Sequence, residues 1–276
     1  MGDYWLEVFT LSALYCIVAL GQYSNMSAGL FALCYAAFMG IGSYAAAVLC
    51  VNFGLPFPFD VFAAAAVTSV VGILFSPLAF RLAHWFLAVA SIAFGESVSL
   101  FFFNTEYFGA SMGFQGVPLR TSPWIVFAFL ALIVLFFVRF NNSRLGQSFR
   151  VVKEDEETAA AMGINVRLIK VYSFAIGTFI AGIGGALIAH YYGVVEPKDL
   201  GMLNSFEFFI FVSVGGVETF WGPVVGTFGL SVLPELLRFS LYDRYIIYGV
   251  VLVLLMILRP RGIVTRKPLG SPGKAL

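Results

Sequence analysis

Charged residues, cysteines and histidines are scarce in this chain. Only 11% of its 276 residues are charged, and it has three cysteines and two histidines. No CxxC pair occurs and the cysteines stand in apolar runs, so local spacing predicts neither a metal site nor a disulfide framework. No GxxxxGK[ST] loop occurs, so any nucleotide that drives the protein must be hydrolysed by another chain. The start MGDYWLE is acidic, so no cleavable signal peptide is expected.

Apolar residues dominate the composition. They make up 60% of the chain, whose mean hydropathy is +0.92, whereas soluble domains average about half apolar and about a quarter charged residues. Apolar runs of about 18 or more residues recur throughout, as expected of membrane-spanning helices. The alternating segments of about ten residues that a membrane β-barrel needs are absent from the sequence. The sequence therefore predicts an all-α polytopic membrane protein.

About nine transmembrane helices are predicted, in a single domain that covers residues 1–276. The predicted spans are 5–20, 26–51, 59–80, 84–103, 123–140, 168–192, two within 204–239, and 242–258. The region 204–239 contains Gly215-Gly216 and Gly222-Pro223. Such interruptions predict at least one broken helix there, because irregular backbone at membrane depth is tolerated only against protein or a cavity.

The distribution of Lys and Arg predicts the orientation in the membrane. With nine spans, about twelve of the 16 basic residues fall on one side, and positive charge favours the cytoplasmic side. The N-terminus is then outside, whereas the loop 141–167 and the basic tail 259–276 are cytoplasmic. The twelve residues are Arg81, Arg139, Arg144, Arg150, Lys153, Arg167, Lys170, Arg259, Arg261, Arg266, Lys267 and Lys274.

Two series of small residues recur at four-residue spacing. Lipid offers no hydrophobic drive for helices to associate, so small side chains that allow close approach indicate helix-packing contacts. The two predicted series are Ala28, Ala32, Ala36 and Gly40, and Gly177, Ala181, Gly185 and Ala189.

Two enzyme motifs occur out of context. Residues 109–113 match GxSxG around Ser111, but that motif needs a strand-turn-helix and here lies in a loop between predicted spans. A membrane-embedded hydrolase remains a hypothesis that depends on Ser111. Residues 40–45 match the dinucleotide pattern GxGxxA, but they lie inside a predicted span with no strand before them. We therefore exclude dinucleotide binding.

Carboxylates at membrane depth are candidates for a translocation path. An ionised group costs roughly 2.5–3.5 kcal/mol at the bilayer centre, so it faces the bundle interior, a partner or water. Glu96, with Ser97 and Asn104, forms a polar face on the fourth predicted span, and Glu207 and Glu218 lie in or beside the broken region. Either these residues line the path, or Glu96 makes a structural hydrogen bond or ion pair between helices.

A polar stretch at 143–163 interrupts the apolar sequence. Leu145, Phe149 and Val152 recur at helical spacing and form one apolar stripe. Acidic residues follow at 154–157, then AAAM, and Gly163 is placed to end a helix. The pattern predicts a short amphipathic helix on the cytoplasmic face with a low-relief surface suited to docking. The alternative is an ordinary solvated loop.

Segments along nearly the whole chain resemble the permease subunits of branched-chain amino-acid ABC importers, most closely the LivM type. In order, they are GIGSYAAAVL, LAVASIAFGESVSLFF, SMGFQGVP, LGQSFRVVKEDEETAAAMGINVRLIK, GTFIAGIGGALIAHYYGVVEP, SVGGVETFWGPVVG, LPELLR and RPRGI. The resemblance implies that the polar stretch is a coupling helix that docks on an ATP-binding subunit. The implied coupling residues are Arg150, Glu154, Asp155, Glu156, Glu157, Ala159, Ala160 and Gly163.

The same resemblance implies a bacterial or archaeal cytoplasmic-membrane location and a set of partners. These are a second similar permease, two ATP-binding subunits that hold ATP and Mg²⁺, an extracytoplasmic solute-binding protein and membrane lipid. No cofactor in this chain, no enzymatic activity of its own and no nucleic acid are expected. The sequence departs from the family at 34–38 and 109–113, which leaves urea or short amides open as substrates. An ion-coupled secondary transporter that uses Glu96 and Glu207 is the other alternative.

Overall fold

The computed structural model describes residues 2–82, 84–236, 253 and 262–264 of this chain. The predicted last span, apart from residue 253, and most of the basic tail lie outside the described residues. The α-helices are α1 (Gly2–Ser27), α2 (Tyr35–Val51), α3 (Phe59–Phe75), α4 (Pro77–Arg81), α5 (His84–Asn104), α6 (Pro123–Asn141), α7 (Arg144–Glu154), α8 (Glu156–Ala161), α9 (Val166–Tyr192), α10 (Met202–Gly215) and α11 (Trp221–Leu236). Short 3-10 turns are η1 (Glu106–Phe108), η2 (Ala110–Met112) and η3 (Pro197–Leu200).

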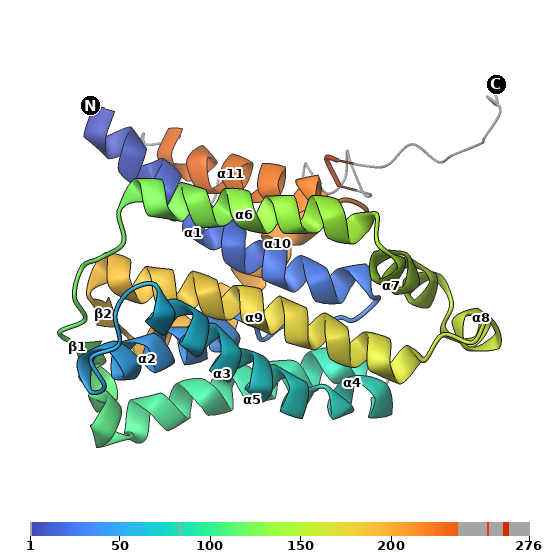
Figure 1. Ribbon diagram of the computed structural model, residues 1–276, viewed down its shortest axis with the longest axis horizontal. Helices are drawn as coiled ribbons and strands as arrows, with labels where there is room; N and C mark the ends of the chain where they lie inside the picture. Colours follow the sequence, from blue (N-terminus) through green and yellow to red (C-terminus); the bar gives the residue numbers. More distant parts are fainter. Residues whose placement is uncertain (1, 83, 237–252, 254–261, 265–276) are drawn as a thin grey trace.

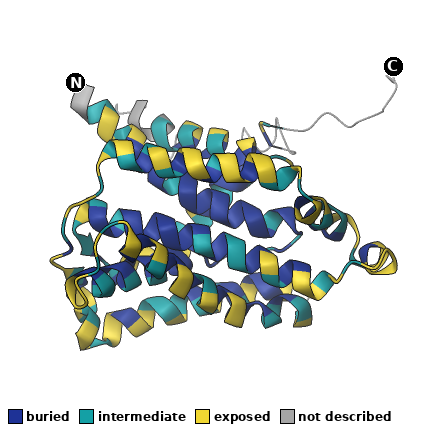
Figure 2. Ribbon diagram, viewed as in Figure 1, coloured by how far each residue is buried: buried dark blue, intermediate teal, exposed yellow. Residues whose placement is uncertain are grey.

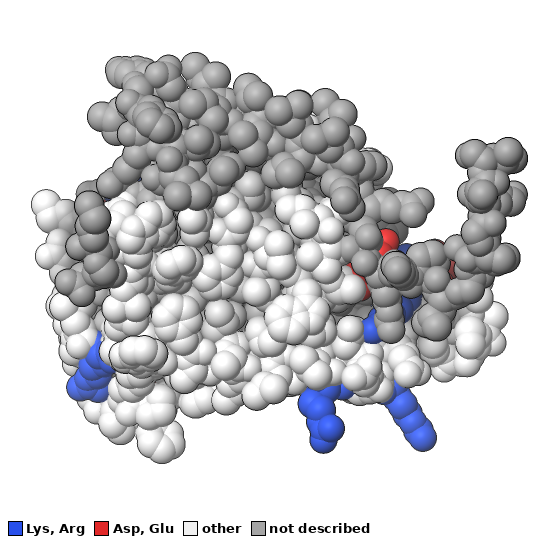
Figure 3. All heavy atoms as spheres, turned by 90° about the horizontal axis from the view of Figure 1, so that it is seen from above, with Lys and Arg blue, Asp and Glu red and all other residues white. Residues whose placement is uncertain are grey.

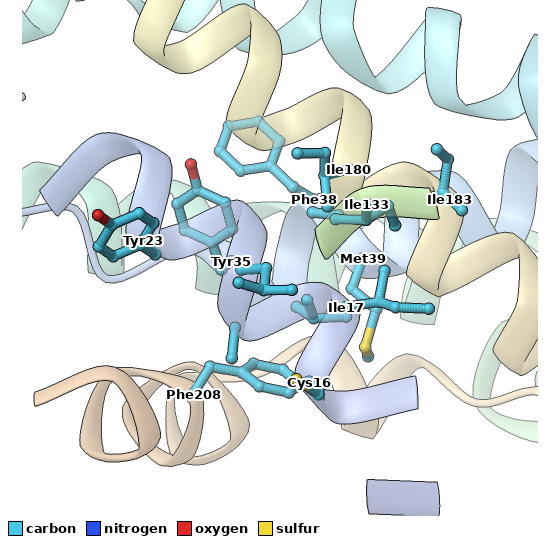
Figure 4. Close-up of a cluster of buried hydrophobic side chains, with 14 of the residues drawn as sticks. Cys16, Ile17, Tyr23, Tyr35, Phe38, Met39, Ile133, Ile180, Ile183 and Phe208 are labelled. Atoms are coloured by element: carbon cyan, nitrogen blue, oxygen red, sulfur yellow. The ribbon is translucent and has the colours of Figure 1, made fainter. Parts of the chain in front are cut away.

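Helix α9 lies at the centre of the bundle and packs against α1, α2 and α3. Most of its residues are buried, whereas the outer helices expose one face (Figure 2). The apolar core around it collects side chains from several helices (Figure 4). The labelled residues of this core include Cys16 and Ile17 of α1, Tyr35, Phe38 and Met39 of α2, Ile133 of α6, Ile180 and Ile183 of α9, and Phe208 of α10.

Small residues let α9 approach its neighbours backbone to backbone. A Cβ added at Gly185 would lie 1.9 Å from the carbonyl oxygen of Met39 on α2. A Cβ at Gly177 would lie 2.6 Å from the carbonyl oxygen of Gly21 on α1, and one at Gly21 would lie 3.1 Å from the backbone nitrogen of Ala181. The series on α9 therefore faces α1 and α2 at distances that larger side chains would prevent.

The long helices run side by side between two different ends (Figure 1). One end carries the turn between α2 and α3 and a two-stranded antiparallel ribbon, in which β1 (Phe114–Gln115) pairs with β2 (Val194–Val195). The other end carries α7 and α8. We call these the ribbon end and the α7–α8 end.

The surface between the two ends suits a lipid environment. Five helical segments of the described chain, those at 4–27, 59–81, 85–104, 123–141 and 166–192, are long and apolar enough to cross a membrane, and α2 and α10 are shorter apolar helices. On one side of the molecule, Figure 3 shows a broad uncharged area between the Lys and Arg side chains. The chain is therefore a polytopic helical membrane protein, as predicted.

The predicted second span is not one continuous helix. Helix α1 continues to Ser27, and α2 begins only at Tyr35, after a non-helical segment with Gly29 at φ +78°. Ala28 and Ala32 lie in this segment, while Ala36 and Gly40 lie on α2. The predicted series of small residues is therefore wrong as a single helix face, although its two parts are buried.

Distant side chains accept hydrogen bonds from backbone amides just before α2 and in its first turn. The amide of Leu33 donates to Ser91 Oγ at 2.7 Å, and that of Ala36 donates to Ser205 Oγ at 3.2 Å. Ser91 lies on α5 and Ser205 on α10. The neighbouring helices thus replace the helical hydrogen bonds that this buried segment lacks.

The interruption expected within 204–239 is a turn between two helices. Helix α10 ends at Gly215, Gly216 has φ +112°, and α11 begins at Trp221. Lys153 Nζ on α7 donates to the carbonyl of Val217 at 3.2 Å, so the turn lies at the α7–α8 end. The predicted interruption at Gly215-Gly216 is therefore present in the described part of this region, as a turn between α10 and α11.

Candidate functional site

Helices α7 and α8 form a small platform between α6 and α9. Ser143 starts α7 by accepting the amide hydrogen of Gly146 at 3.2 Å. Phe149 and Val152 are 1% and 2% exposed and pack in one apolar cluster with Ile169 of α9. Leu145, which the sequence placed on the same stripe, is exposed instead. The platform therefore packs against the bundle through Phe149 and Val152, the last two residues of the predicted stripe.

The platform has two helices where the sequence predicted one. Asp155 has extended backbone angles and separates α7 from α8. Its Oδ1 accepts the amide hydrogen of Glu157 at 2.9 Å, and its Oδ2 accepts the hydroxyl of Thr158. These hydrogen bonds to the charged form, first that of Thr158 and then that of Glu157, lower the pKa of Asp155. The residue therefore works as an N-cap in the middle of the polar stretch.

Gly163 ends α8, as the sequence predicted. It adopts φ +80°, its amide donates to Ala160 at 3.0 Å, and the amide of Ile164 donates to Ala159 at 3.1 Å. This pair of bonds is a Schellman motif, which requires a left-handed residue at this position. Ile164 also packs with the cluster that contains Ala159. A hydrophobic contact thus accompanies the stop.

Three of the predicted coupling residues face the bundle. Ala159 is fully buried in the cluster beneath the platform, so it offers no surface for docking. Arg150 hydrogen-bonds through Nη2 to the carbonyl of Asn141 at 3.0 Å and to its side chain, which ties α7 to the end of α6. Glu156 makes an ion pair with Lys170 of α9 at 2.7 Å. The expectation that Ala159 belongs to the docking surface is therefore wrong.

The outer face of the platform is composed of small, acidic and apolar side chains. Met162 is 68% exposed. Sequence reasoning missed Met162, although its position just before a glycine stop and after three alanines was available as a signal. The exposed residues are Glu154, Asp155, Glu157, Thr158, Ala160, Ala161, Met162 and Gly163.

Glu96 makes a structural contact between helices. Its Oε1 accepts the backbone amide of Met202 at 2.6 Å, at the first residue of α10. A carboxylate at a helix N-terminus is stabilised by the unpaired amides and by the helix dipole. Ser97 and Asn104 are exposed and donate to carbonyls of their own helix, at 2.7 Å and 2.8 Å. The three residues therefore do not form one continuous polar lining.

Glu207 and Glu218 line two different cavities. Glu207 lines a cavity of about 310 Å³ to which α1, α2, α9, β2, η3 and α10 contribute side chains. Glu218 lies in the α10–α11 turn beside Lys153, at the α7–α8 end. The two were predicted to line one path, and no cavity found among the described residues is lined by both.

The cavity with Glu207 combines acids, hydroxyls and apolar side chains. Lys198 forms an ion pair with Glu196. Partial desolvation, and then the nearby Glu196 carboxylate, raise the pKa of Asp199. Neither Asp199 nor Glu207 has an ion-pair partner in the part of the chain that the structure describes. The acidic excess favours a cationic group in the cavity, and the lining also includes Tyr15, Tyr192, Leu200 and Phe208.

The GxSxG match has no hydrolase geometry. Ser111 is exposed in η2, between Gly109 and Gly113, and not on a turn from a strand to a helix. His190 is occupied by Asp60 and by the carbonyl of Pro118. The context that a nucleophile elbow requires is therefore missing around Ser111.

Comparison with known proteins agrees with the sequence resemblance. The family described as branched-chain amino acid transport system / permease component matches residues 4–259. The chain is 28% identical over 295 residues to the high-affinity branched-chain amino acid transport system permease protein LivM of Escherichia coli (strain K12), covering 94% of this chain and 69% of that protein. It is 30% identical over 166 residues to LivH of the same strain, covering 59% of this chain and 51% of LivH.

An archaeal relative is also similar. The probable branched-chain amino acid transport permease protein LivM of Methanocaldococcus jannaschii is 24% identical over 229 residues, covering 74% of this chain and 66% of that protein. No solved structure matches this chain.

Proposed function

We propose how this subunit works from one premise: the chain belongs to the family of branched-chain amino acid transport system permease components. It is accordingly a multi-pass membrane subunit of a branched-chain amino acid ABC transport system, and as a permease component it is not an ATPase. The finer assignments below concern its orientation, its partners and its mechanism.

The α7–α8 end faces the cytoplasm and the ribbon end faces outward. The turn between α10 and α11 lies at the α7–α8 end, and the amides of Ile263 and Val264 donate to Val214 and Gly215 there, both at 2.9 Å. The start of the C-terminal tail is thus at the same end as the platform. The basic residues of 139–170 gather on this side, which favours a cytoplasmic location. Nine spans then place the N-terminus outside.

The α7–α8 platform receives an ATP-binding subunit. The observation that carries this proposal is the combination of a low, exposed surface around Met162 with a base anchored in the bundle through Glu156 and Lys170. A push on the platform would reach α9, the central helix, through this ion pair and the apolar cluster beneath it. ATP-driven movement of the partner could thus shift the bundle between two arrangements.

Substrate enters at the ribbon end and leaves at the cytoplasmic side. An extracytoplasmic solute-binding protein delivers the substrate to the ribbon end. A second permease subunit completes the translocation path. The cavity beside Glu207 offers carboxylates for an α-ammonium group and apolar side chains for an aliphatic one. The two ATP-binding subunits hold ATP and Mg²⁺, and this chain needs no cofactor for the cycle.

Two matched substitutions of exposed methionines test the docking site. Met162 on the platform is 68% exposed, and Met112 in η2, outside the platform, is 77% exposed. In the complete importer reconstituted in vesicles, Met162→Glu should reduce ATP-dependent leucine uptake and co-purification of the ATP-binding subunit at least about tenfold, because a buried unpaired charge costs several kcal/mol at an interface. Met112→Glu should leave that co-purification unchanged.

The same vesicles distinguish the alternatives. Co-purification and uptake that survive Met162→Glu would exclude this docking surface. Uptake that persists without ATP but collapses with the ion gradient would indicate a secondary transporter. Urea or acetamide uptake in place of leucine uptake would reassign the substrate without affecting the docking result.

A further inference from the structure

Three metal-ligating side chains meet at the ribbon end of the bundle. Cys50 lies in the last turn of α2, Asp60 in the first turn of α3, and His190 in the last turn of α9. One ligand atom of each lies within 4.8 Å of the other two. Asp60 and His190 are fully buried, and Cys50 is 7% exposed. The transport mechanism proposed above uses none of them.

Hydrogen bonds orient two of these ligands toward the common point. His190 Nδ1 lies 2.9 Å from the carbonyl oxygen of Pro118. A carbonyl only accepts, so Nδ1 carries the hydrogen and Nε2 is directed at Asp60 Oδ2, 2.6 Å away. Asp60 Oδ1 accepts the amide hydrogen of Val61 at 2.9 Å, which leaves Oδ2 toward the histidine. Metal-binding histidines are typically held in this way, with the second ring nitrogen donating to a carbonyl.

A buried Asp60–His190 pair joins α3 to α9, and a side-chain hydrogen bond between Cys50 and Asp60 adds α2 to it. These contacts bring a thiol, an imidazole and a carboxyl group to one point in a buried site. Binding of a divalent cation would release the thiol proton of Cys50 and the proton that His190 Nε2 shares with Asp60 Oδ2. The carboxylate, thiolate and neutral imidazole that result carry two negative charges, which the cation balances. The donor set of sulfur, nitrogen and oxygen suits Zn²⁺, which accepts all three ligand types and often keeps a fourth position for water.

The distances are compatible with one bound ion after small side-chain movements. Zn²⁺ binds nitrogen and oxygen at about 2.0–2.2 Å and sulfur at about 2.3 Å, so donors around a tetrahedral ion stand about 3–4 Å apart. Nε2 and Oδ2 are now closer than that at 2.6 Å, and the donor atoms of all three residues lie within 4.8 Å of one another. Rotation of the Cys50 and Asp60 side chains could open the site to accept an ion.

We propose that Cys50, Asp60 and His190 form a binding site for Zn²⁺ or a divalent cation of similar softness. This revises the expectation of no metal site, which rested on local sequence spacing. The bound ion would join the ends of α2, α3 and α9 with the loop at Pro118, all at the ribbon end (Figure 1). The proposal is independent of the substrate and of the ATP-binding partners.

Metal titration of the full-length chain purified in detergent tests the site. With Co²⁺ as the probe, the wild-type protein should bind one ion and show thiolate-to-metal absorption. Cys50→Ala and Cys50→Ser should both lose this absorption. Cys16→Ala and Cys34→Ala are matched controls, because both thiols are buried elsewhere, and they should retain it. Zn²⁺ should compete for the same site.

A thermal measurement gives a second readout. Zn²⁺ should raise the unfolding temperature of the wild-type chain and of the two control variants, because a ligand bound to the folded state stabilises it. Cys50→Ser and Asp60→Asn should lower Zn²⁺ affinity at least tenfold and diminish that rise. Removal of a residue that only hydrogen-bonds to a metal ligand already lowers metal affinity about 10–100-fold, and loss of a ligand should cost no less. Absence of the thiolate band in the wild type, or a band that survives in Cys50→Ala, would overturn the proposal.

Discussion

The carboxylate of Glu156 lies 2.7 Å from the ammonium group of Lys170, and the lysine side chain is only 7% exposed while that of the glutamate is 39% exposed. Lys170 Nζ also approaches the carbonyl of Ala79, at 3.4 Å, where α4 passes the start of α9. Lys170 of the central helix α9 thus forms an ion pair with Glu156 of the surface platform. This contact is the polar part of the connection between α8 and the bundle, and the cluster around Ala159 is the apolar part.

Glu156→Gln should weaken this connection. It leaves the buried ammonium of Lys170 without its counter-ion, and because Glu156 is partly solvated we expect a loss of about 1–2 kcal/mol in unfolding free energy, below the range for fully buried pairs. Thermal unfolding of the purified chain measures the effect. Glu157→Gln is the control, since Glu157 is exposed and has no ion pair among the described residues. Equal losses in the two variants would contradict the anchoring role of Glu156.

Gly163→Ala should destabilise α8 through the backbone alone. Nothing lies within 4 Å of a Cβ placed there, but the residue has φ +80°, a conformation that costs a residue with a Cβ about 1–2 kcal/mol. Asn tolerates this region better, so Gly163→Asn should lose less. Gly229→Ala is the control, because its added Cβ is also free of contacts and lies in a helix. Unfolding temperatures in the order wild type, Asn, Ala are expected, and a loss in the Gly229 variant equal to that of Gly163→Ala would refute this explanation.

Glu96 should act on stability more than on transport. Glu96→Ala removes the acceptor for the amide of Met202 and should cost about 1–2 kcal/mol, as loss of a helix cap does. Glu96→Gln keeps an acceptor and should retain most of the stability and of the leucine uptake. If Glu96→Gln abolished uptake while the importer still assembled, the carboxylate would belong to the translocation path.

Gly185→Ala should disturb the packing of α9 against α2. Its Cβ would meet the carbonyl oxygen of Met39 at 1.9 Å, and backbone cannot move aside as a flexible side chain can. We expect a loss of about 1–3 kcal/mol, typical of overpacking. Gly95→Ala is the matched control, since its Cβ would find its nearest neighbour at 3.9 Å. An unfolding temperature lower for Gly95→Ala than for Gly185→Ala would contradict the close approach of α9 to α2.

Acid should release the N-cap of α8. The pKa of Asp155 is lowered in the folded chain by the hydroxyl of Thr158 and the amide of Glu157. A lowered folded-state pKa gives stability that is present above the ordinary aspartate pKa and is lost as the pH falls through the folded value. Protection of the Glu157 amide against hydrogen exchange should therefore persist at neutral pH and disappear as the pH falls below the ordinary aspartate pKa. Thr158→Val should move this loss of protection to higher pH. An unchanged dependence of protection on pH would contradict the role of the Thr158 hydroxyl in lowering the pKa of Asp155.

Local signals in the sequence were sufficient for much of the fold. The glycine stop at Gly163 needs only backbone bonds to Ala159 and Ala160, and the apolar runs that predict spans are equally local. The break at Asp155 was missed although it is local too, because an acid within an acidic run reads as a solvated helix face until its side chain is seen to cap the next turn.

Long-range partners explain the other errors. The start of α2 depends on Ser91, 58 positions away from Leu33, which supplies a hydrogen bond that no nearby residue announces. Glu96 meets an amide 106 positions away, so sequence alone could state both of its possible roles but not decide between them.

By itself the sequence determined that this chain is a helical membrane permease component, because hydropathy, charge distribution and family motifs are properties of the chain read in order. Only the tertiary structure decided which side chains of the platform face the bundle, where the acidic cavity lies, and that Cys50, Asp60 and His190 share one point. Those features depend on atoms brought together from separate helices, and side-chain direction across such contacts is settled by packing and not by local spacing.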